Sequence, residues 1–137
     1  MTILALDVGA QRIGVATANV IARIASPLVT IPNNESIVET VQQLIAENDV
    51  EMLVVGLPRG LDGQETAQTQ TVRDFVSNLQ QTIGDFPMQF QDEALTSRKA
   101  EEELEARGKP YQKGDIDALA ATYILDDYLQ ENAGAIA

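Results

Sequence analysis

Asp7, one member of the pair Asp92–Glu93, and Asp117 are the side chains whose types and surroundings best suit catalysis. Asp7 interrupts the apolar run Ile3–Val8, which in length and composition is typical of a strand buried on both faces. An ionised carboxylate withdrawn from water costs several kcal/mol unless a cation or hydrogen-bond donors compensate it. We therefore expect a metal ion at Asp7. The alternative is that Asp7 lies just past the strand end and caps the turn at Gly9–Ala10.

The other two acids also stand at the ends of expected elements. Asp92 and Glu93 follow a short strand pattern, and Asp117 is the only charge on a helical stripe that should face the sheet. Asp115 is two residues away and therefore on another face, where an acid ordinarily stabilises a helix N-terminus. The other members of the stripe are Ala121, Ile124, Leu125 and Tyr128.

The hydrophobic period changes from two to 3.6 partway along the chain, which predicts an α/β domain. Three strands in an antiparallel meander come first, and two helix-to-strand crossovers, which should be right-handed, follow them. The result is a mixed five-stranded sheet flanked by helices, in which the first, fourth and fifth strands are parallel. The pattern predicts strands at residues 2–8, 12–18, 27–31, 52–55 and 88–91, and helices over 37–45, 72–83, 96–106 and 114–129.

This topology would gather the acids. The carboxyl ends of the parallel strands share one edge, where ligands collect in such sheets. That edge receives Asp7, the loop Gly56–Pro58 and the Asp92–Glu93 pair, while the last helix brings Asp117. We therefore expect Asp7, the Asp92–Glu93 pair and Asp117 to converge on one site.

Composition limits the chemistry. The 137 residues suit a single domain, 1–137, with residues 131–137 as a frayed tail. The chain has no Cys and no His, which leaves carboxylates, hydroxyls, Lys, Arg and Tyr and argues against zinc. There is no charged leader with a cleavage site, and no apolar stretch approaches the ~20 residues of a membrane span. We expect a soluble, cytoplasmic protein without a membrane partner.

The net charge of −12 argues against a nucleic-acid partner without excluding one. A metal ion can supply local positive charge while the remaining surface stays acidic. The basic residues are also concentrated, which indicates either a substrate patch or a solvated surface. The cluster comprises Arg98, Lys99, Arg107, Lys109 and Lys113.

Four motifs stand in order along the chain, from Leu6 to about Leu129. They are Leu6–Gly9 with Arg12–Ala16, Val54–Pro58 with Asp62–Gly63, Asp92–Ser97, and Lys113–Gly114 with Asp117–Ala121. Together these motifs resemble the YqgF/RuvX family. The resemblance implies an RNase H-like fold and activity as a pre-16S rRNA nuclease or a Holliday junction resolvase. The family's acidic triad falls on Asp7, Glu93 and Asp117.

The chain departs from the family pattern in two places. Ala94 stands where the motif around Glu93 more often has Arg, although Arg59 and Arg98 are nearby in sequence. More distant junction resolvases carry an acid at the end of the fourth strand, where this chain has Gly56–Pro58. Both departures bear on Glu93.

Three carboxylates suit phosphodiester hydrolysis, because two divalent ions about 4 Å apart can stabilise the extra negative charge and activate water. Hard oxygen ligands favour Mg²⁺ or Mn²⁺. We assign Asp7 as the central ligand, flanked by Glu93 and Asp117. Lys113 is the first candidate for a phosphate contact and Arg12 the second, each with a solvated-surface alternative. Arg98 is a further substrate-binding candidate.

The remaining motif residues have ordinary structural interpretations. Thr96 and Ser97 should cap the helix that follows them. Four residues should shape a loop at the edge of the site rather than bind substrate. They are Gly56, Pro58, Asp62 and Gly63.

Three functions remain open from the sequence. The leading hypothesis is a metal-dependent endonuclease of pre-rRNA or branched DNA. The second is a noncatalytic nucleic-acid or ribosome-associated factor, which the negative charge favours. The third is an ATP-binding relative that uses the turn Asp7–Gly9 for phosphates, although such ATPases close two domains around the nucleotide. Junction cleavage would favour a homodimer, because the substrate has two equivalent strands.

Overall fold

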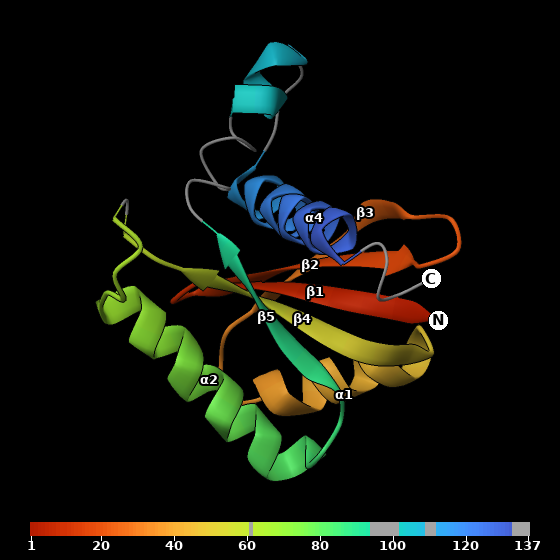
Figure 1. The fold of residues 1–137 in the computed structure, drawn as a ribbon, viewed down its shortest axis with the longest axis vertical. Helices are drawn as coiled ribbons and strands as arrows, with labels where there is room; N and C mark the ends of the chain where they lie inside the picture. Colours follow the sequence, from red (N-terminus) through yellow and green to blue (C-terminus); the bar gives the residue numbers. More distant parts are fainter. Residues whose placement is uncertain (61, 94–101, 109–111, 133–137) are drawn as a thin grey trace.

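The computed structural model describes residues 1–60, 62–93, 102–108 and 112–132. A single five-stranded sheet, in the order β3-β2-β1-β4-β5, lies at its centre (Figure 1). The predicted mixed sheet is confirmed: β1 pairs antiparallel with β2 and parallel with β4, which pairs parallel with β5. The strands are β1 (Thr2–Val8), β2 (Arg12–Asn19), β3 (Ile24–Pro32), β4 (Val50–Pro58) and β5 (Met88–Glu93).

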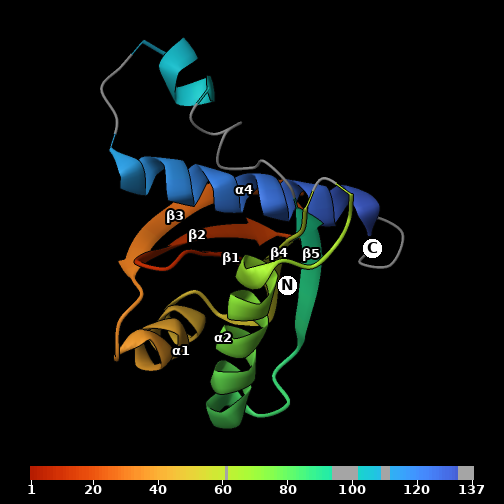
Figure 2. The same ribbon diagram turned by 90° about the vertical axis from the view of Figure 1, so that its left-hand side faces the viewer.

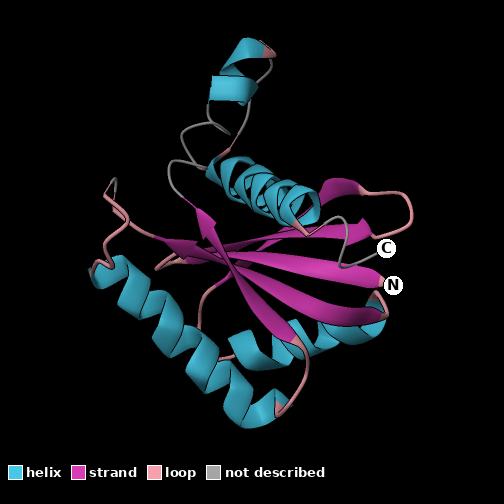
Figure 3. Cartoon of the chain, viewed as in Figure 1, coloured by secondary structure: helices cyan, strands magenta, loops and turns pink. Residues whose placement is uncertain are grey.

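Helices cover both faces of the sheet. Figure 2 shows α4 on one face and α1 and α2 on the other, and Figure 3 distinguishes the helical and strand layers. The crossovers through α1 and α2 bring β4 and β5 into parallel pairing. The helices are α1 (Ile37–Glu47), α2 (Ala67–Ile83) and α4 (Lys113–Glu131).

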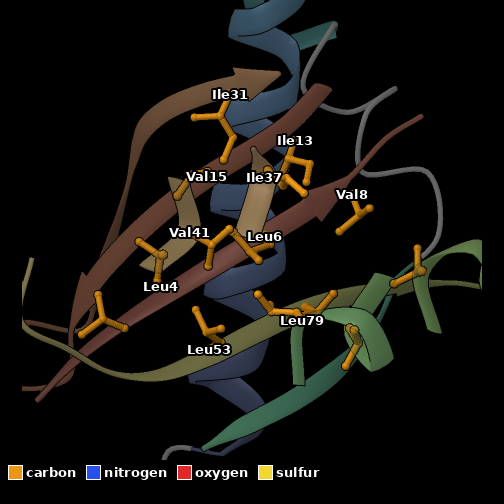
Figure 4. Packing of buried hydrophobic residues seen from close by; sticks show 14 of the residues in the cluster. Leu4, Leu6, Val8, Ile13, Val15, Ile31, Ile37, Val41, Leu53 and Leu79 are labelled. Carbon is orange, nitrogen blue, oxygen red and sulfur yellow. The ribbon is translucent and has the colours of Figure 1, made fainter. Parts of the chain in front are cut away.

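The core beneath α1 and α2 consists of aliphatic side chains at alternate strand positions (Figure 4). In β1 these are the even-numbered residues, so the odd-numbered ones face α4. Asp7 therefore belongs to the α4 face. The labelled side chains on the core side include Leu4, Leu6, Val8, Ile13, Val15 and Leu53.

Small residues line the α4 face of the sheet, which lets α4 approach it closely. The predicted apolar stripe is confirmed, since Ala121, Ile124, Leu125 and Tyr128 are all buried against the sheet. We expected Gly56 to shape a loop, and this prediction is wrong. It lies inside β4, and a side chain there would overlap the Cδ1 atom of Ile124.

Several element ends differ from the sequence prediction. β3 and β4 are longer than predicted, and Asp92 and Glu93 lie inside β5 instead of following it. Glu131 is not frayed: it ends α4 and its carboxylate accepts a hydrogen bond of 2.8 Å from the Gln91 amide. The two strands extend because their ends pair with neighbours, which the hydrophobic pattern does not record.

Residues 102–106 form a short helix, in agreement with the end of the predicted helix at 96–106. The rest of that prediction, including Thr96, Ser97, Arg98 and Lys99, lies outside the described residues, as does Lys109. Within the described ranges, no helix has the length and apolar composition that crossing a membrane requires.

β3 forms one edge of the sheet. It pairs only with β2 among the five strands, and most of its residues are exposed. Pro27 and Pro32 interrupt its row of backbone donors, and the pairing with β2 shifts register between Val15 and Ala16. These features bend and interrupt the exposed edge.

Gly14→Ala should lower the melting temperature by roughly 5–10 °C. A Cβ atom at Gly14 would overlap the backbone carbonyl of Asp117, so α4 must shift away from β2. The measurement is thermal unfolding followed by circular dichroism.

Gly114→Ala is the matched control, because the nearest atom to a Cβ there is Thr30 Cβ at 3.6 Å, an ordinary contact. Alanine also favours helix over glycine by up to about 1 kcal/mol. This variant should melt at or above the wild-type temperature. Equal melting of Gly14→Ala and wild type would show that α4 does not need this close approach.

Candidate active site

Asp7 lies within β1, where its cross-strand partner on β2 is Gly14. It is half-buried and faces α4, together with the buried Ile3 and Ala5. The alternative reading of Asp7 as a turn cap after the strand is therefore wrong. The carboxylate is held in the sheet, facing a helix that packs against it.

Gly14 lets the backbone of α4 approach that position. The Asp117 carbonyl occupies the space that a side chain at Gly14 would fill. One strand further, Thr30 pairs with Gly14, and its hydroxyl donates a 2.5 Å hydrogen bond to the Gly114 carbonyl. The first turn of α4 thus rests on a row of three strands, which brings Asp117 beside Asp7.

Asp7 has a perturbed acidity. Burial, and to a lesser extent the nearby negative charge of Asp117, together raise its pKa from 3.8 to about 6. The two carboxylates that the sequence placed far apart therefore interact electrostatically. A cation between them would relieve both the desolvation and the repulsion.

Arg12 is the cation that contacts Asp117. Its Nε atom donates to the Oδ2 atom of Asp117 at 2.6 Å, and the two side chains are 38% and 20% exposed. The turn before Arg12 is fixed by a hydrogen bond from the Gly9 amide to the Arg12 carbonyl, at 2.9 Å. Asn33 donates from its side chain to the Gly9 carbonyl at 2.8 Å, which ties this turn to the end of β3.

Glu93 lies on the same face but further along the sheet. It ends β5 opposite Pro58, whereas Gln91, opposite Gly56, lies closer to the level of Asp7. Two residues of strand correspond to roughly 7 Å, and two strand spacings add about 10 Å across the sheet. Glu93 is thus farther from Asp7 than Asp117 is.

The predicted substrate contacts have different outcomes. Arg12 lies at the site and pairs with Asp117. Lys113 begins α4, but its side chain and all of Arg98 lie outside what the structure describes. Asp115 has the capping role expected of it: it is exposed, and its Oδ2 atom accepts a 2.9 Å hydrogen bond from the Gln112 amide.

Carboxylate oxygens are ligands that hard divalent cations such as Mg²⁺ or Mn²⁺ prefer. A cation at Asp7 would stabilise its ionised form, which burial and Asp117 disfavour. Among the described residues, however, no three acids are close enough together to hold an ion as they stand. Asp7 and Asp117 interact electrostatically, and one oxygen of Asp117 is engaged by Arg12.

Sequence reasoning did not identify Gly14 and Asn33 as residues that position the site. A glycine inside a strand pattern can indicate a close backbone approach, so Gly14 carried a usable signal. Asn33 carried none, because its bond to Gly9 depends on how β3 returns to the first turn.

The family comparison matches nearly the whole chain. A model of the RuvX family, described as Holliday junction resolvase, matches residues 1–131. A Chloroflexus aggregans protein named "Putative pre-16S rRNA nuclease" is 45% identical over 132 residues, which cover 93% of this chain and 92% of the relative. A Sulfurihydrogenibium protein of the same name is 40% identical over 93% of this chain and 88% of its own length.

Solved structures show the same fold at lower identity. "T. thermophilus RuvC in complex with Holliday junction substrate" has a TM-score of 0.58 and 17% identity, and the match covers 98% of this chain and 96% of that one. The fowlpox virus Holliday junction resolvase has a TM-score of 0.56 and 11% identity, with 96% and 99% covered. The expected RNase H-like fold is confirmed.

Asp7→Asn should stabilise the metal-free protein at about pH 8, and only about a third as much at about pH 4.5. The raised pKa means that Asp7 favours the folded state below pH 3.8, and this contribution is lost as the pH rises through about 6. The full shift corresponds to at most about 3 kcal/mol. Urea unfolding in EDTA at several pH values measures the difference.

Asp85→Asn is the control, because it removes the same formal charge from an exposed turn after α2. Its stability relative to wild type should depend much less on pH over this range. If Asp7→Asn gains no more stability at the higher pH than at the lower one, Asp7 is not the carboxylate with the raised pKa.

Proposed function

Because the chain belongs to the RuvX family, as its motifs predicted, we propose that it is a metal-dependent endonuclease of structured nucleic acid. We further propose that it processes the 5′ end of pre-16S rRNA in ribosome biogenesis. The observation that carries the proposal is the placement of Asp7 and Asp117 side by side, with the pKa of Asp7 raised by burial and by Asp117.

In this proposal Asp7 is the central ligand of Mg²⁺ or Mn²⁺, with Asp117 and Glu93 flanking it. The bound metal would activate water and stabilise charge on the scissile phosphate. Asp7 holds its position through the sheet, and Asp117 through the contact of α4 with Gly14. Glu93 lies on the same face of the sheet, at the end of β5.

In this proposal, basic residues at the N-terminal ends of α4 and β2 bind the substrate. Lys113 and Arg12 are the proposed phosphate contacts, with Arg98 a third. Phosphate contacts orient a nucleic acid without reading its sequence, which suits an enzyme that recognises structure. The acidic remainder of the surface, at a net charge of −12, weakens nonspecific binding and helps product release.

Pre-rRNA is the favoured substrate because the relatives that match at 39–45% identity carry the pre-16S rRNA nuclease name. Cleavage of a four-way DNA junction is the second candidate, supported by the family description. A junction substrate would call for a two-fold homodimer, since its two cleavage sites are equivalent. The acidic surface remains the argument for a noncatalytic role on the ribosome.

Asp7→Asn and Asp117→Asn should each lower cleavage by orders of magnitude while the protein still folds, because each removes a ligand charge. Asp115→Asn should keep most of the activity, because its carboxylate caps α4 and is exposed. The loss of that cap costs about 1 kcal/mol of stability at most. The assay uses labelled structured RNA and four-way DNA with Mg²⁺, Mn²⁺ or EDTA.

The choice of substrates separates the candidates. Metal-dependent cleavage of RNA alone supports the rRNA assignment, and cleavage of the junction alone supports a resolvase. Cleavage that survives in rigorously purified Asp7→Asn would rule out this site. Equal losses in Asp115→Asn and Asp117→Asn would contradict the distinction between the two faces of α4.

A further inference from the structure

The ion pair between Arg12 and Asp117 occupies an oxygen of a proposed metal ligand. Arg12 extends from the first residue of β2 on the face that α4 covers, and its Nε atom lies 2.6 Å from Asp117 Oδ2. The guanidinium compensates the negative charge of Asp117 in the metal-free protein. The positive charge of Arg12 therefore lies beside the carboxylate that would also bind a divalent ion.

Two cations cannot both use the same carboxylate oxygen without cost. We propose that Arg12 is a positioning residue that holds Asp117 in the metal-free protein and competes with the divalent ion for it. The inference rests on the proposed metal site.

The structure allows this exchange. The Arg12 backbone is fixed by the turn at Gly9, but its side chain is 38% exposed, so the guanidinium can move into solvent without unfolding the sheet. The backbone of Asp117 is fixed by its contact with Gly14, so Arg12 holds only the side chain of Asp117. Only side-chain torsions therefore need to change when a metal replaces the guanidinium.

The expected effect is moderate, because a partly exposed ion pair contributes little to stability. Removing the competing cation should strengthen metal binding by about two- to fivefold. If Arg12 only oriented Asp117 for the metal, its replacement would weaken metal binding instead of strengthening it. The direction of the change therefore separates competition from simple support.

The test is a thermal-unfolding titration with Mn²⁺ at constant ionic strength, on wild type, Arg12→Met and Arg73→Met. A ligand that binds only the folded state stabilises it by RT ln(1 + [L]/Kd), so the melting temperature rises with the ratio of ligand concentration to Kd. Arg12→Met should melt below wild type in EDTA and reach a given Mn²⁺-dependent rise at about two- to fivefold lower Mn²⁺. Far-UV circular dichroism confirms that the variants are folded.

Arg73→Met is matched for chemistry and charge. Arg73 Nε lies 2.7 Å from Glu65 Oε1, and the Arg73 side chain is 35% exposed, but this pair belongs to α2 and the segment before it. It should show the wild-type Mn²⁺ response, apart from the small general attraction of a more acidic protein. Arg12→Lys keeps the charge and should fall between wild type and Arg12→Met.

An unchanged or weaker Mn²⁺ response in Arg12→Met, with a clear response in wild type, would overturn the competition while leaving the proposed nuclease site intact. An equal gain in Arg73→Met would also overturn it, because general electrostatics would then explain the effect. A wild type with no Mn²⁺ response would overturn the proposed metal site and this inference together.

Discussion

The candidate site depends on one backbone contact, between α4 and β2. Gly14 stands opposite Asp7 in the sheet, and the Asp117 carbonyl lies where any larger residue would place its side chain. This contact determines how near the two carboxylates come. It also places the first turn of α4 over β3, where the Thr30 hydroxyl bonds to Gly114. Because protein interiors are closely packed and leave few voids, such a contact fixes the position of the helix relative to the sheet.

The acidic side chain at the centre of the site differs from most other acids of the molecule in its exposure to solvent. Most of the acidic residues are solvated, whereas Asp7 is held in a sheet under a helix, and its pKa is raised to about 6. Arg12 partly compensates the acids locally. A chain with a net charge of −12 can therefore carry a site whose electrostatics are set by three or four side chains rather than by the whole surface.

The fold could be predicted because periodicity reports which face of each element is buried. The helical stripe through Asp117 and Leu125 predicted which face of the last helix packs against the sheet. The apolar run around Asp7 predicted a strand buried on both faces. Periodicity says nothing about contacts between elements. It could not predict the pairing of Arg12 with Asp117, and it misassigned Gly56 to a loop, because the reason for that glycine is Ile124 on another element.

The exposed edge of the sheet has a consequence for how this protein behaves at high concentration. A nine-residue edge strand with Leu28 and Val29 partly exposed would offer a template for strands of other molecules. Pro27 and Pro32 lack amide donors, and the register shift beside Pro27 twists the strand away from a flat neighbour. Intermolecular sheet growth from β3 is thereby disfavoured, which protects an acidic, apolar-cored chain from fibril-like association.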